Sequence, residues 1–184
     1  MAFGLTERLM PRTHHLKLPS ATPRQQAENR SLWNDGRSPE SADFFTIGYS
    51  GRKLEELLGA LVKAGVQTLI DVRQNPVSMY RPEVSKANLR TAVQARGLQY
   101  LHLPELGVPR DVRALAIHAG SKQVIWDWYD QEVASPYLRR NLHHFLNASE
   151  HPVAFMCAEL DPSECHRHRL FVALEEHGLR GYEL

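Results

Sequence analysis

Short apolar runs alternate with amphipathic segments along the chain from residue 44 onward. The run from Phe44 to Gly48 is apolar and β-branched, which is typical of a buried strand. The apolar residues that follow recur every three or four positions, as on one face of a helix: Leu54, Leu57, Leu58, Leu61 and Val62. Residues 68–73 then predict a second strand. Strand, helix and strand over this distance predict a βαβ unit with parallel strands.

The same alternation continues through the middle of the chain. Ser50 is the expected N-cap of the first helix, and Ser85 is the expected N-cap of a second helix that ends near Gly97. Residues 98–103 predict a third strand. Residues 111–149 contain no strand pattern, so we expect two or three helices there.

The last third of the chain predicts a fourth strand over 152–156, a helix over 162–177 and a short fifth strand over 182–184. Asp161 and the proline after it have the form of a helix start. The fold class that follows is α/β: a single domain with an open, mostly parallel, Rossmann-like sheet of about five strands and helices on both faces.

Composition bounds the organisation of the chain. A chain of 184 residues, 42% of them hydrophobic, is long enough to bury one hydrophobic core. We assign the α/β domain to residues 44–184. Residues 1–43 have no hydrophobic period and predict an extension that is poorly ordered or draped over the domain. A net charge of +1 argues against bulk binding to nucleic acid or membrane.

Two cysteines are too few for a disulfide framework and fit a reducing compartment. The N-terminus lacks the apolar run of a signal peptide, and we therefore expect a cytoplasmic protein with no membrane partner. The oligomeric state is left open by the sequence.

Ligands of open α/β sheets bind beyond the carboxyl ends of the strands, which gathers the candidate residues at one edge. Asp71 and Arg73 end the second strand as an acid and a base on the same side. We expect Asp71 among the catalytic groups and Arg73 as an anchor for an anionic substrate. The loop residues Tyr49, Ser50 and Ser78 are further candidates for substrate binding.

Both cysteines follow the fourth strand, with Glu159 between them and His166 and Arg167 after them. A helix that starts at Pro162 would place Cys165 in its first turn, where the helix dipole and the neighbouring cations favour thiolate. We therefore interpret Cys165 or Cys157 as a nucleophile, with His166 and Glu159 as proton-transfer groups and Arg167 as a second anion anchor. The alternative is that both cysteines are packed as small apolar side chains.

Two other functions remain open. Cys157, Cys165 and His166, with Glu159 or Asp161, would suit zinc, but seven residues separate the cysteines and adjacent helical residues point apart, so no metal or cofactor is expected. A basic face suits nucleic acid instead, with nearby aromatic side chains to stack on bases. Its members are Arg110, Arg113, Arg139, Arg140, His143 and His144, and the aromatic residues are Trp126, Trp128 and Tyr129.

Several separated motifs resemble the family called domain of unknown function 488, from about residue 44 to the end. They are Gly48-Tyr-Ser50, Asp71-Val-Arg73, Lys86-Ala-Asn-Leu89, Tyr100-Leu-His-Leu-Pro104, Cys157-Ala-Glu159 and Cys165-His166-Arg167. The resemblance implies one α/β domain with family residues at these positions, and it implies no settled activity. The order of an Asp-Val-Arg strand end and a later strand-borne cysteine is also similar to the layout of rhodanese sulfurtransferases, without the glycines that follow the cysteine there.

Together these features favour an enzyme with a Cys/His/Arg/Glu site at the carboxyl edge of the sheet, a thiol-dependent transferase or hydrolase for a small anionic or nucleotide-like substrate. The alternatives are a protein that binds nucleic acid or processes its bases, and a zinc-binding regulatory module.

Overall fold

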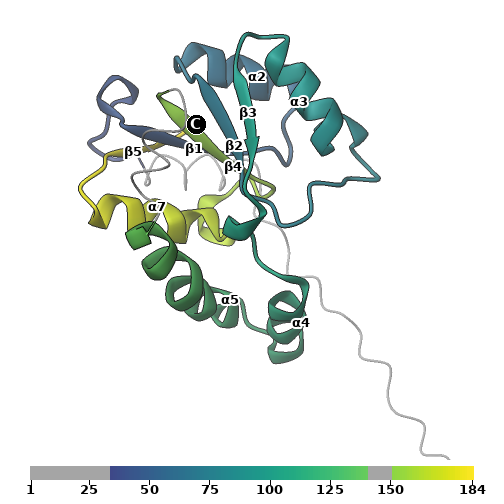
Figure 1. Cartoon of the computed structure of the whole chain (residues 1–184), viewed down its shortest axis with the longest axis vertical. Helices are drawn as coiled ribbons and strands as arrows, with labels where there is room; N and C mark the ends of the chain where they lie inside the picture. The colour runs from purple at the N-terminus through teal and green to yellow at the C-terminus, as the bar shows by residue number, and fades with distance from the viewer. Residues whose placement is uncertain (1–33, 141–150) are drawn as a thin grey trace, which may run out of the picture.

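The computed structural model describes residues 34–140 and 151–184, and within them one open sheet holds five strands (Figure 1). The strands are β1 (Phe44–Gly48), β2 (Thr68–Asp71), β3 (Gln99–His102), β4 (Val153–Cys157) and β5 (Gly181–Glu183). Their order across the sheet is β3-β2-β4-β1-β5, and every neighbouring pair is parallel. The α/β class is thus confirmed, with a sheet that is wholly parallel.

Helices cover both faces of this sheet, as expected. α2 (Leu54–Lys63) and α3 (Lys86–Gln94) lie over one face, whereas α4 (Arg110–Ala119), α5 (Gln123–Tyr129) and α7 (Arg167–Glu176) lie over the other (Figure 1). Because strand residues alternate in direction, β4 contributes Ala154 and Met156 to the core under α2 and α3, and Phe155 and Cys157 to the core under α7.

The start of the first helix differs from the sequence prediction. The N-cap of α2 is Lys53, whose backbone N–H donates to the Glu56 carboxylate over 2.9 Å, so the prediction of Ser50 was wrong. α3 does begin directly after Ser85. The Ser85 hydroxyl, however, bonds the backbone of Ser78 rather than its own helix, which ties two ends of one loop together.

The helix expected from Pro162 to His177 is broken, which corrects a second prediction. A short 3-10 turn covers Pro162–Glu164, and its N-cap Asp161 accepts from the Ser163 N–H over 2.9 Å. Cys165 then has extended backbone angles (φ −126°, ψ 143°), and α7 begins only at Arg167. The backbone therefore changes direction at Cys165, between the 3-10 turn and the longer helix α7.

The expected helical region is confirmed from Arg110 to residue 140, and it includes a π-helical turn at Asp130–Ala134. Residues 1–33 and 141–150 lie outside the described ranges. Asn34 bonds the backbone of Glu183 with both ends of its amide, at 2.8 and 2.9 Å. The division between an extension and a domain at residue 44 stays a prediction.

Candidate functional site

The carboxyl ends of the strands meet at one edge, and the predicted residues divide there between its two faces. Register pairs Gly48 with Cys157 and Asp71 with Met156. Cys157 belongs to the core under α7, whereas Asp71 bonds Tyr100, which packs under α2 and α3. Two separate groups therefore replace the single site that the sequence predicted.

The first group consists of Cys157, Cys165, His166 and Glu159. The Cys157 Sγ lies 3.8 and 3.9 Å from the two His166 ring nitrogens and 3.6 Å from Glu159 Oε2. One ligand atom each from Cys157, Cys165 and His166 lies within 4.8 Å of the others. These three residues are only 2%, 1% and 4% exposed, so they form a compact and almost dry cluster.

The break in the helix allows this convergence. Cys165 is extended and His166 is the N-cap of α7, so the two neighbours do not follow helical geometry. Their side chains can therefore enter the same cluster. The sequence argument against a shared metal site had assumed that both residues belong to one helix.

The electrostatics of Cys165 differ from the sequence prediction. Burial, with the neighbouring Cys157 and Glu159, raises the pKa of the Cys165 thiol well above its ordinary value. The predicted position of Cys165 in the first turn of a helix is wrong, whereas its role as a nucleophile stays a prediction. Burial by itself would raise the pKa of Glu159 too, but the hydrogen bond from the Cys165 thiol and the charge of His166 lower it overall.

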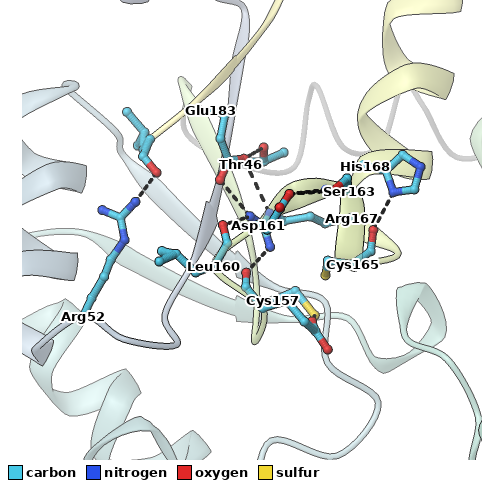
Figure 2. A network of polar contacts seen from close by, with 12 residues as sticks. Thr46, Arg52, Cys157, Leu160, Asp161, Ser163, Cys165, Arg167, His168 and Glu183 are labelled. Carbon is cyan, nitrogen blue, oxygen red and sulfur yellow. Dashed lines mark hydrogen bonds and ion pairs between the residues drawn. The ribbon is translucent and has the colours of Figure 1, made fainter. Parts of the chain in front are cut away.

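Arg167 is fully buried and fastens the loop that carries Glu159 (Figure 2). Its guanidinium donates to the Glu159 carbonyl, to the Leu160 carbonyl over 2.9 Å and to the Glu183 carboxylate over 2.8 Å. Thr46 donates to the same carboxylate. Burial alone would lower the pKa of Arg167, but Glu183 raises it above its ordinary value. The guanidinium is thus engaged with protein groups.

The second group joins Asp71, Arg73, Tyr100 and Tyr49. Asp71 accepts from Arg73 Nε over 2.8 Å and from the Tyr100 hydroxyl over 2.7 Å, and the Arg73 guanidinium lies over the Tyr49 ring at 5.1 Å. Burial lowers the pKa of Arg73, but the bonds to Asp71 raise it overall. Burial and Asp71 both raise the pKa of the Tyr100 hydroxyl.

The serine candidates hold loops. The Ser78 N–H donates to the Ser85 hydroxyl over 3.0 Å, and the Ser78 hydroxyl accepts from the Arg81 N–H over 3.0 Å. The Ser50 N–H donates to the Ala158 carbonyl over 2.8 Å, which joins the loops after β1 and β4.

Sequence reasoning missed two features of these groups: the contact of Tyr129 with His166, and the pairing of Lys86 with His102. The Tyr129 ring centroid lies 5.2 Å from that of His166, and its hydroxyl donates to the Leu106 carbonyl over 2.9 Å. Helical spacing had identified Tyr129 only as a core or stacking residue. Lys86 Nζ lies 2.9 Å from His102 Nδ1, and His102 Nε2 lies 2.9 Å from the Arg73 carbonyl oxygen. The family motifs included both residues, but nothing in the sequence indicated that they pair.

The structure describes only part of the predicted basic face. Arg139 and Arg140 are exposed, and each donates to a carbonyl one turn earlier in its own helix. Arg113 bonds the Val108 carbonyl over 3.1 Å. His143 and His144 lie outside the described residues.

The molecule is an α/β protein with a buried cysteine–histidine cluster at the carboxyl edge of its sheet. Residues 53–174 match the family described as "Domain of unknown function DUF488", and the chain belongs to that family. The matched segment includes both groups of site residues except Tyr49, and it is narrower than the resemblance expected from residue 44 onward. No curated protein and no solved structure matches the chain.

In the ranges that the structure describes, no helix is both long and apolar enough to cross a bilayer.

Proposed function

We propose that this protein binds one zinc ion through Cys157, Cys165 and His166. The observation that carries the proposal is the mutual approach of their ligand atoms to within 4.8 Å, in a cluster built from two elements. Zinc is bound by cysteine sulfur and histidine nitrogen, commonly in tetrahedral geometry. Two thiolates and an imidazole suit zinc much better than magnesium or calcium, which prefer oxygen.

The separations within the cluster support this assignment. Zinc lies about 2.3 Å from sulfur and about 2.0 Å from imidazole nitrogen, so tetrahedral ligands are separated by about 3.5 to 3.8 Å. Cys157 Sγ lies 3.8 Å from His166 Nδ1 and 3.6 Å from Glu159 Oε2. The Cys157–His166 separation thus already matches zinc ligation. The ligand atom of Cys165 lies within 4.8 Å of the other two and would move closer on binding, and the Glu159 side chain would have to turn toward the three to serve as the fourth ligand.

Burial supports a metal over a free thiol nucleophile. A nucleophile must be reached by its substrate, whereas Cys157 and Cys165 are at most 2% exposed. A buried metal also links the end of β4 to the start of α7 and thereby stabilises the loop between them.

The test is elemental analysis of the full chain, purified without chelator. We expect about one zinc per chain, and a loss of most of that zinc in Cys157→Ser, Cys165→Ser and His166→Ala. His168→Ala is the matched control, because His168 lies on the same helix, where its Nδ1 is 2.7 Å from the Cys165 carbonyl oxygen and its ring packs on Trp126, and it is not one of the three proposed ligands. Equal zinc content in the His166 and His168 variants, or none in the parent chain, would overturn the proposal.

The second candidate is the thiol-dependent enzyme, acting on a small anionic or nucleotide-like substrate. The contact of Cys157 Sγ with both His166 and Glu159 favours it, since a nucleophile beside a base has this form. It predicts that iodoacetamide labels Cys157 faster than a free thiol even in the metal-loaded chain. Protection by zinc, and labelling only after chelation, would exclude it.

Nucleic-acid binding by the helical face that carries Arg139 and Arg140 stays a prediction. It requires binding that weakens steeply with salt, which a filter assay with single-stranded DNA measures directly.

A further inference from the structure

Glu159 differs from the other members of the cluster in its access to solvent. The cysteines and His166 are buried, whereas Glu159 is half-buried. It is therefore the most exposed of these four residues.

The backbone of Glu159 is held on two sides. Its carbonyl accepts a bond from the buried Arg167, and it passes so close to Gly48 that a Cβ on that glycine would lie less than 3.0 Å away. A shift of the loop is therefore unfavourable. Rotation about side-chain bonds remains, and it moves the carboxylate between staggered positions without disturbing the strand or α7.

The Glu159 carboxylate contacts the two thiols and its own backbone N–H. It lies 3.6 Å from Cys157 Sγ and accepts a hydrogen bond from Cys165, and no salt bridge within 4.0 Å joins it to any other residue of the described ranges. Cysteines bound to zinc are thiolates and have no proton to donate. With the ion bound, the carboxylate must either coordinate it or turn toward solvent.

The charges favour an exchangeable contact. Zinc with two thiolates is neutral, and coordination by Glu159 gives the buried centre a net charge of about −1. Replacement of the carboxylate by water restores neutrality, and replacement by a monoanion leaves the charge unchanged while Glu159 regains its hydration. Neither exchange requires the other three ligands to move.

We propose that Glu159 is the displaceable fourth ligand of the zinc centre, so that the ion accepts water or a small monoanion at that position. This inference rests on the zinc site proposed above. An open fourth position is what distinguishes catalytic zinc sites, in which the ion polarises a bound water, from closed structural ones.

The experiment uses the full chain loaded with Co²⁺ in place of zinc. Thiolate ligation gives a charge-transfer band, and the visible d–d bands report the fourth ligand. We expect azide to change the d–d bands saturably, and to do so at a concentration at least about tenfold lower in Glu159→Gln, which removes the competing carboxylate. Glu164→Gln is the control, because Glu164 is exposed and pairs with Lys122; it should match the parent.

The outcomes separate the two proposals. If the parent chain shows no charge-transfer band, the zinc centre itself is wrong. If the band is present but azide leaves the d–d spectrum unchanged in the parent and in Glu159→Gln, the site is closed and the exchange is wrong. Loss of Co²⁺ from Glu159→Gln alone would make Glu159 an obligate ligand, which also overturns the exchange.

Discussion

Gly48, the last residue of β1, lies directly against the carbonyl of Glu159, and any larger residue would collide with it. This contact sets the path of the loop that carries the candidate metal ligands. The requirement is steric, because Gly48 is not among the residues with positive φ.

Replacement of Gly48 by alanine is therefore expected to destabilise the fold by about 3 kcal/mol or more, since the added methyl group overlaps fixed backbone atoms. Urea unfolding measures the change. Gly59 provides the control: it is exposed on α2 with nothing within 4 Å of an added Cβ, so Gly59→Ala should stabilise by about 0.5 to 1 kcal/mol. Equal stability of the two variants would contradict the contact.

Within residues 34–140 and 151–184, Glu183 is the carboxylate that pairs with the buried Arg167, and the two side chains are 1% and 0% exposed. Glu183→Gln leaves a buried guanidinium without its counter-charge, and we expect a loss of about 3 to 5 kcal/mol. Thermal unfolding of Glu175→Gln is the comparison, because the pair of Glu175 with Arg37 is partly exposed and contributes less than about 1 kcal/mol. If Glu183→Gln also loses less than about 1 kcal/mol, the Arg167 guanidinium must be hydrated in that variant.

The two groups of the carboxyl edge should respond separately to mutation. Asp71→Asn removes the charge that faces buried Arg73 and should cost about 3 to 5 kcal/mol, whereas Tyr100→Phe removes one hydrogen bond and should cost about 1 kcal/mol. Because both residues lie on the face opposite Cys157, folded Tyr100→Phe should retain the zinc content of the parent by elemental analysis. Loss of zinc in that variant would show that the groups are coupled.

Acid should weaken the pair between Asp43 and Arg180. The hydrogen bond from Arg180 lowers the pKa of Asp43, despite an opposing effect of burial. A lowered carboxyl pKa stabilises the fold above the unfolded value of about 4, and this contribution is lost as pH falls through the folded value. Asp43→Asn should thus be slightly less stable than the parent near neutral pH, and the difference should be small because the Arg180 side chain is 67% exposed. The difference in unfolding free energy should fade in acid; a difference that persists there would have another cause.

Sequence periodicity predicted the strands and most helices because the three central strands, β1, β2 and β4, are runs of residues buried on both sides and the helices have an apolar face. It failed at residues 162–166, where an Asp-Pro start opens only a 3-10 turn. It also treated Asp71 and Cys157 as neighbours, because the strand-end rule locates an edge but not a face of the sheet. The commitment of Arg167 to Glu183 depends on a contact with the last strand, which local pattern does not reveal.

The central place of β4 has a kinetic consequence. β1 and β2 do not pair with each other, and the gap between them is filled only by residues 153–157, about a hundred positions after β1. Until that segment is synthesised, two apolar strands have unpaired inner edges of the kind that associate between chains. The cysteine–histidine cluster is formed by this inserted strand and the segment after it, so a metal could bind there only after β4 has taken its place in the sheet.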